Sequence, residues 1–277
     1  SQTNGAYLEE GVLYERPCLD RRDPWCQPYG VFMSRIRVEL HSHTYWSPDC
    51  GVKPDTLLRN AQRKGLGAIA ITDHNQIGGA FEARDLGILP VIVGEEIKTN
   101  QGELLAYFLE EFIPSGMSVA DTVKAITEQS GIISVPHPFD RYRSSAIDHE
   151  ALVGITDHLD MIEIFNSRNL RSEDNDRARE FQKRHRIIPA VGSDAHSLIE
   201  IGRSYQEIDT FDGAREFLAA MDNAKLITRK SSVLIHYIST YQRLKKRFTG
   251  QARPTVHKEQ IAHAAGSNPD SRPYDVP

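Results

Sequence analysis

Residues 68–74 read Ala-Ile-Ala-Ile-Thr-Asp-His, an apolar run that ends abruptly in polar side chains. Four consecutive apolar residues are typical of a strand that is buried on both faces, as in a parallel sheet. The same order, an apolar run followed by polar residues, recurs along the chain. We therefore predict strands at 36–40, 68–71, 89–93, 104–109, 132–135, 161–165 and 187–191.

Helical patterns separate most of these runs. Pro54 fits the first turn of a helix that ends near Gly65, and Ser118 is a typical N-cap residue for a helix over 119–129. Repeated strand–helix units predict an α/β fold with a parallel sheet. About seven right-handed crossovers fit a closed barrel better than the alternative, an open sheet. Further helices are predicted at 79–86, near 150, and at 172–185, 211–222 and 233–248.

The two ends of the chain differ from this regular part. Residues 1–34 contain several prolines and little periodicity, so we expect an irregular N-terminal extension that packs on the main domain. Residues 35–230 form the predicted barrel domain. Residues 231–277 comprise a helix and a polar tail, and by itself the tail from 249 has a disordered composition.

Composition narrows the classes of protein to consider. The chain has 277 residues and a formal net charge of −5, which argues against a strongly basic nucleic-acid binder. No apolar run reaches the roughly 18 residues of a membrane helix, and the first ten residues do not resemble a signal peptide. Cys18, Cys26 and Cys50 form no paired motif. Their odd number argues against a disulfide framework and favours a reducing compartment, so we expect a cytoplasmic location.

Histidines and carboxylates gather where the predicted strands end. His41 and His43 follow the first strand, and in an extended segment such alternate side chains point to the same side. In a barrel, the carboxyl ends of the strands meet on one face, where active sites are built. Many unpaired imidazoles and carboxylates on one rim would be costly without a cation. We therefore predict that metal ligands come from this set, which comprises His41, His43, Asp49, Asp73, His74, Glu95, Glu96, His137, Asp194 and His196.

As an ordered set, these motifs resemble those of the polymerase and histidinol phosphatase (PHP) superfamily, over about residues 35–207. The resemblance implies a distorted (β/α)7 barrel with two or three metal ions and hydrolysis of phosphoesters. It assigns one metal to His41, His43, Glu96 and Asp194, a second to Glu96, Glu103 and His137, and a third to Asp49, His74 and His196. The chain departs from the family at Glu103, where a histidine is usual.

Three arginines near the predicted rim are candidate substrate ligands. Arg141 and Arg143 follow His137, and Arg168 follows the strand at 161–165. A guanidinium group matches phosphate oxygens well, although each arginine could equally form an ordinary surface ion pair.

The resulting hypothesis is a metal-dependent phosphoesterase, a phosphatase or nuclease acting on a nucleotide or another small phosphorylated substrate. Its cofactors would be two or three divalent ions, Mn²⁺, Fe²⁺ or Zn²⁺, with Mg²⁺ as a further option. Asp194 and His196 are the candidate catalytic residues. Two alternatives stay open: an ester or amide hydrolase on the same barrel, and a metal-stabilised binding module without turnover. The pattern predicts neither a membrane association nor an oligomeric state.

Overall fold

The computed structural model describes residues 6–9, 12–15 and 35–249. The chain divides into two units at Ser34 and Arg35. In the first unit, β1 (Ala6–Glu9) and β2 (Val12–Glu15) pair as an antiparallel hairpin, where the sequence pattern led us to expect irregular structure. The predicted tail beyond Thr249 lies outside the described residues.

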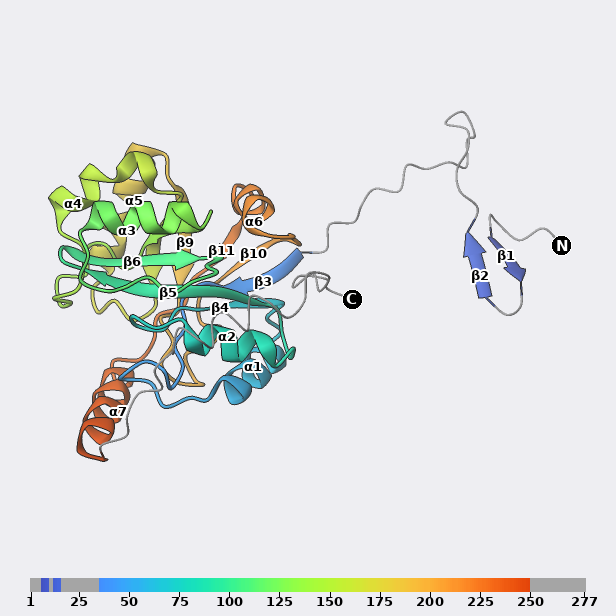
Figure 1. The fold of residues 1–277 in the computed structure, drawn as a ribbon, viewed down its shortest axis with the longest axis horizontal. Coiled ribbons are helices and arrows are strands. Elements are labelled where there is room, and N and C mark those ends of the chain that lie inside the picture. The colour runs from blue at the N-terminus through green and yellow to red at the C-terminus, as the bar shows by residue number, and fades with distance from the viewer. Residues whose placement is uncertain (1–5, 10–11, 16–34, 250–277) are drawn as a thin grey trace. The chain divides into compact units, whose positions relative to one another are not determined.

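The second unit is an α/β fold with one curled sheet, and this confirms the predicted class (Figure 1). Its strand order is β11-β10-β3-β4-β5-β6-β7-β8-β9. The strands are β3 (Arg35–Glu39), β4 (Ala68–Ile71), β5 (Val91–Thr99), β6 (Gly102–Tyr107), β7 (Ile132–Val135), β8 (Met161–Asn166), β9 (Ile188–Gly192), β10 (Tyr205–Asp209) and β11 (Lys225–Ile227).

Most of the helices connect these strands, and α7 follows the last strand. They are α1 (Pro54–Arg63), α2 (Gly78–Asp85), α3 (Val119–Glu128), α4 (His149–Gly154), the 3₁₀ turn η1 (Thr156–His158), α5 (Ser172–His185), α6 (Ala214–Met221) and α7 (Ile235–Thr249). Ser118 caps α3 as predicted, because its side chain accepts a hydrogen bond from Asp121 N. No described helix is long and apolar enough to cross a membrane.

The sheet is mixed, which corrects the expectation of parallel strands throughout. β3, β4 and β5 run parallel, as do β7, β8 and β9. In contrast, β6 is antiparallel to both of its neighbours, and β10 is antiparallel to β3. The reason lies in the short connection between β5 and β6, which permits only a hairpin, because a parallel crossover needs a dozen or more residues.

The barrel is nearly closed between its last parallel strand and its first. The side chain of Gln206, on β10, accepts a hydrogen bond from Val191 N of β9 and donates to Val38 O of β3. Above this point Ser42 and Ala195 form an isolated parallel bridge. Two segments that lie at opposite ends of the barrel sequence are therefore fixed side by side at the carboxyl ends of the strands.

Two apolar layers support the sheet, and β4 shows how. Ala68 and Ala70 pack in a cluster with Val38, whereas Ile69 and Ile71 pack with Leu57 of α1 in the other cluster. The burial of all four β4 residues confirms that this strand is covered on both faces.

Gly102 begins β6 at the hairpin that carries Glu103. Its φ angle is +127°, and a β-carbon there would lie 2.2 Å from Ile147 Cα. We expect Gly102→Ala to lower the free energy of unfolding by about 3 kcal/mol or more, since backbone strain and a backbone clash add. Gly116→Ala is the matched control: its φ is also positive, but nothing lies within 4 Å. It should cost only about 1–2 kcal/mol. Equal losses in urea unfolding would contradict the role given to the Ile147 contact.

Candidate metal centre

The predicted ligands converge at the carboxyl ends of the strands. The Ser42–Ala195 bridge sets His41 and His43 beside Asp194 and His196, with His43 N donating to Ala195 O at 2.9 Å. A second bridge joins His74 to Glu96. All nine predicted metal residues are buried except Asp49 and His74, which are partly buried.

Glu96 reaches the centre differently from the prediction. We expected it just past the end of a strand at 89–93, but β5 continues to Thr99 and Glu96 lies within it. The strand continues because its first part pairs with β4 and its later part pairs with β6. Glu96 therefore lies within a strand that is paired on both sides, and not in a loop after the strand as predicted.

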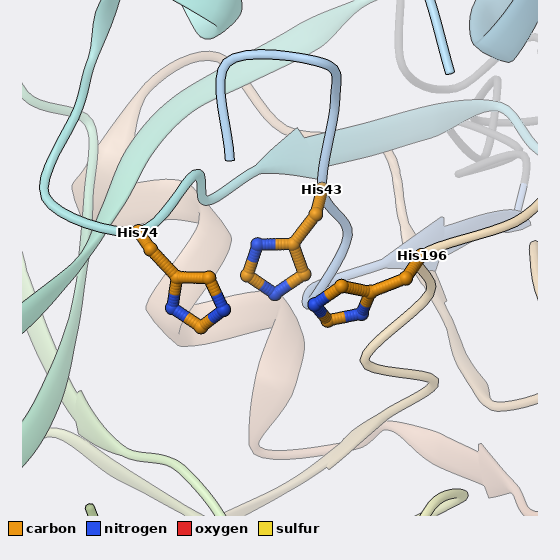
Figure 2. A group of neighbouring side chains, drawn as sticks. All are labelled: His43, His74 and His196. Carbon is orange, nitrogen blue, oxygen red and sulfur yellow. The ribbon is translucent and has the colours of Figure 1, made fainter. Parts of the chain in front are cut away.

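Figure 2 shows the imidazoles of His43, His74 and His196 facing one another. Ring centroids are 4.4 Å apart for His43 and His74, and 4.1 Å apart for His43 and His196. Burial and the neighbouring His196 and His74 hold the pKa of His43 well below its usual value, so this ring is neutral and has a lone pair to offer a cation. Four overlapping groups have ligand atoms within 4.8 Å of one another: His43–His74–His196, His41–His43–Glu96, His41–His137–Asp194 and His74–Glu96–Glu103.

In this buried site, neighbouring charges shift the pKa values so that the carboxylates are negative and some imidazoles are positive. Burial alone would raise the pKa of Asp194, but Arg143 and His41 outweigh it and hold that pKa well below its usual value. Burial likewise lowers the pKa of His74, yet Glu96 and Asp49 raise it to about 10. The centre therefore holds charged carboxylates, and their positive partners are imidazolium and guanidinium groups that a metal ion could replace.

Glu103, where a histidine was the usual residue, lies at the edge of this group. Its Oε2 atom is 3.9 Å from His137 Nε2, and its ligand atoms also cluster with those of His74 and Glu96. Burial and the neighbouring Glu96 raise the pKa of Glu103. The structure thus brings Glu103 into the centre, in a position where a cation would stabilise its charged form.

The three predicted substrate arginines differ in their contacts. Arg143 donates to Asp194 Oδ2, and Arg168 Nη1 lies 2.6 Å from His196 Nδ1. Arg141 instead pairs with Asp174, through Nε at 2.9 Å and Nη2 at 2.8 Å. Two of the three guanidinium groups are therefore in contact with the candidate metal ligands, and the third is occupied at a different carboxylate.

Sequence reasoning missed Glu163, a buried carboxylate in β8 that touches two predicted ligands. Its Oε1 accepts a hydrogen bond from His41 Nδ1 at 2.8 Å, and its Oε2 accepts one from His137 N at 2.8 Å. The first bond fixes the His41 tautomer, so that Nε2 keeps its lone pair for a metal. A signal existed, because Glu163 is the one charged residue in the apolar run Met161–Phe165.

His43 has a comparable support. Its Nδ1 is 3.1 Å from Ser47 Oγ, and the same hydroxyl donates to Asp73 Oδ1 at 2.6 Å. Because Ser47 gives its proton to Asp73, its oxygen must accept from His43 Nδ1. His43 Nε2 is then left with a lone pair that faces the centre, as at His41.

Two regions match family models. Residues 39–128 match the model described as the PHP domain, and residues 172–226 match the model described as PHP-associated. Two uncharacterized proteins of Methanocaldococcus jannaschii are similar. MJ0417 is 34% identical over 173 residues, which cover 61% of this chain and 69% of the relative. MJ1587 is 36% identical over 147 residues, which cover 48% of this chain and 82% of the relative.

One solved structure resembles the fold with a TM-score of 0.58 and 19% sequence identity. It is a two-domain protein from Bacteroides vulgatus, described as containing a predicted PHP-like metal-dependent phosphoesterase. The match covers 71% of the present chain and 65% of the other. At this identity the likeness concerns the fold alone.

Replacing Glu163 should weaken metal binding without removing a ligand. In Glu163→Gln, one side-chain oxygen becomes an NH₂ group, so the side chain can no longer accept from both His41 Nδ1 and His137 N. We expect metal affinity to fall about 10- to 100-fold, as for other residues that orient metal-binding histidines. The control is Glu95→Gln, a buried carboxylate that binds Ile113 N and no predicted ligand. Equal affinities for both variants in metal titrations would contradict this role.

Proposed function

The chain belongs to the PHP family, and on that premise we propose that it is a metal-dependent phosphoesterase acting on a nucleotide or another small phosphomonoester. The observation that supports this proposal is a set of buried ligand atoms that have no hydrogen-bond partner. Among the nine predicted metal residues, eight have a buried side-chain nitrogen or oxygen without a hydrogen-bond partner: His41 Nε2, His43 Nε2, Asp49 Oδ1, Glu96 Oε2, Glu103 Oε2, His137 Nδ1, Asp194 Oδ1 and His196 Nε2.

Such atoms are expensive to bury, and they fit a cation. An unpaired buried polar group costs on the order of 1–3 kcal/mol, and more when it is charged. Imidazole nitrogens and carboxylate oxygens are the ligands of Zn²⁺, Mn²⁺ and Fe²⁺. The residues present therefore fit the metal ions implied by the family. When bound, such ions lower the pKa of a water ligand toward neutrality and stabilise negative charge on a phosphoryl group.

The family assignment of ligands to three ions remains a proposal. His41, His43, Glu96 and Asp194 would hold one ion, Glu96, Glu103 and His137 a second, and Asp49, His74 and His196 a third. Three divalent ions bring six positive charges, and the four carboxylates Asp49, Glu96, Glu103 and Asp194 bring four negative ones. The remainder, +2, matches a phosphate dianion better than a neutral ester or amide.

Arg168 is poised to exchange partners. Its guanidinium is a permanent donor, so the 2.6 Å contact requires His196 Nδ1 to be unprotonated. Metal binding through Nε2 requires the opposite tautomer, with Nδ1 carrying the proton toward Asp194 O at 2.9 Å. Arg168 would then lose this acceptor and could donate to a substrate phosphate. Arg143, at Asp194, is the second candidate for this role.

Asp194 and His196 remain the proposed catalytic residues. The low pKa of Asp194, which Arg143 and His41 impose against the effect of burial, keeps this side chain ionised at neutral pH. An ionised carboxylate accepts a hydrogen bond from an attacking water and so orients it, but a carboxylate of low pKa is a weak base. The proton on Nδ1 of a metal-bound His196, beside Asp194 O, is the second proton next to the centre. Arg141 is the weakest of the proposed substrate ligands, since Asp174 already occupies its guanidinium.

Release of inorganic phosphate from a panel of nucleotides and sugar phosphates tests the proposal. We expect turnover with added Mn²⁺, loss of turnover in a chelator, and recovery when Mn²⁺ is restored, because the ligand atoms fit a divalent ion. Carboxyl esters, amides and a single-stranded oligonucleotide belong in the same panel. Hydrolysis of esters or amides alone would identify the first alternative. Metal binding without turnover of any substrate would identify a binding module.

Glu103 should set the metal preference of the centre. A carboxylate is a harder ligand than imidazole, so Glu103 favours Mn²⁺, Mg²⁺ or Fe²⁺ over Zn²⁺ at the ion it contacts. We expect Glu103→Gln to lower Mn²⁺-supported turnover by roughly tenfold or more. Glu103→His should restore metal binding with the preference moved toward Zn²⁺.

The control for these variants is Glu39→Gln. Glu39 is a buried carboxylate at the end of β3 that accepts from Gly202 N and is not among the predicted ligands. Metal analysis and turnover should change only in the Glu103 variants. If Gln and His at position 103 leave metal content and metal preference as in the original chain, Glu103 is not a ligand.

A further inference from the structure

Helix α7 has two chemically different faces. The face toward the barrel contains the buried residues Ile235 and Ser239, and also Lys246, whose Nζ donates to Tyr45 O at 2.6 Å and to Ser47 O at 2.7 Å. Ser239 Oγ accepts a hydrogen bond from Arg168. Ile235, Ser239 and Lys246 are four and seven positions apart, so they form one stripe that fixes α7 to the loops of the metal centre.

The opposite face carries a row of exposed apolar side chains. Leu234, Tyr237, Tyr241, Leu244 and Phe248 are between 45% and 84% exposed, and Ile238 beside them is 37% exposed. Six of the twelve exposed large apolar residues in the described chain therefore lie in this one segment. Monomeric proteins rarely expose such a contiguous patch, so it marks an interaction surface.

The spacing of this row points to a helix as the partner. Steps of three, four, three and four residues separate Leu234, Tyr237, Tyr241, Leu244 and Phe248. This is the a/d pattern of a heptad repeat, in which side chains of one helix insert between those of another. The row lies opposite the barrel-facing stripe, and Figure 1 shows α7 at the edge of the barrel body. A second helix therefore has access to it.

The charge distribution of α7 favours a partner helix that runs antiparallel to it. α7 contains Arg243, Lys245, Lys246 and Arg247 in its second half and no acidic residue. Two parallel copies would bring these basic residues together, which is unfavourable. An antiparallel pair places each basic half beside the uncharged first half of the other helix. Such a pair also has the two-fold symmetry of most homodimers.

The exposed apolar area of α7 is large enough for a specific dimer interface. A fully buried aromatic side chain removes roughly 150–250 Å² from solvent. Tyr237, Tyr241 and Phe248 are 63% to 84% exposed, so the six aromatic rings of two copies would bury on the order of 600–1,000 Å². With the leucines and Ile238, the total reaches the roughly 1,000 Å² that a specific interface needs.

We propose that the outer face of α7 is a dimerisation surface, on which α7 of a second copy packs antiparallel with Tyr241 at the crossing point. Leu234 then meets Phe248 of the other copy, and Tyr237 meets Leu244. Because the inner face of the same helix contacts Tyr45, Ser47 and Arg168, dimerisation holds α7 against the metal centre. This proposal is independent of the reaction that the centre catalyses.

Sedimentation of the full chain across a range of concentrations tests the surface. We expect a dimer that Tyr241→Glu and Leu244→Glu each convert to a monomer, with the dissociation constant raised at least 100-fold. Val153→Glu is the matched control, since Val153 is also an exposed apolar helical residue, on α4, and it should leave the dimer intact. A monomeric original chain, or a dimer that both α7 variants leave unchanged, would overturn the proposal.

Oxidative cross-linking tests the direction, in a chain with Cys18→Ser and Cys26→Ser; the remaining Cys50 is buried. Tyr241→Cys should give a covalent dimer because the crossing point faces itself. Leu244→Cys should not, because that position faces Tyr237 in an antiparallel pair; efficient cross-linking there would reject the antiparallel arrangement.

Anionic vesicles and a single-stranded oligonucleotide serve as competing partners. Their capture by a monomeric chain, lost in Tyr241→Glu, would assign the surface to them instead.

Discussion

The structure depends on placing charged and polar ligand atoms in a site from which water is largely excluded. Asp194 and Glu96 are completely buried, and their charges are compensated mainly by neighbouring cations and imidazoles. That arrangement explains features that would otherwise be unfavourable. His137 and Asp194 both have positive φ angles, which non-glycine residues adopt at a cost when the surroundings demand it. Gly192 has no side chain because a β-carbon there would lie 1.9 Å from Glu163 Oε1.

The sequence predicted those parts of the centre that follow regular strands. His41, His43, Asp194 and His196 come directly after apolar runs, so their position on one face followed from the rule that parallel strands end together. Glu96 was placed on the correct face but in the wrong element, because pairing with β6 extends β5 beyond its apolar start. Such pairing is a long-range property that a local pattern does not contain. As ligands, all nine residues remain a prediction.

What was missed has a common cause. Strand β10, Tyr205–Asp209, alternates buried and partly buried residues, and no continuous apolar run marks it. Its role depends on Gln206, whose side chain joins β9 to β3. Glu163 was overlooked because a single acid in an apolar strand has no meaning until its partners are known. Both residues act through contacts with chain segments more than a dozen residues away, which sequence periodicity does not report.

The Ser42–Ala195 bridge has a consequence for how the protein is made. It joins residues that are 153 positions apart, the difference between 195 and 42. During synthesis, His41 and His43 leave the ribosome long before their neighbours exist, so a complete ligand set cannot form on the nascent chain until residue 196 has emerged. Contacts of such sequence separation form slowly because loop closure opposes them. The strands in between must therefore begin to acquire their order before the ligand set is complete, with the apolar layers as their main support.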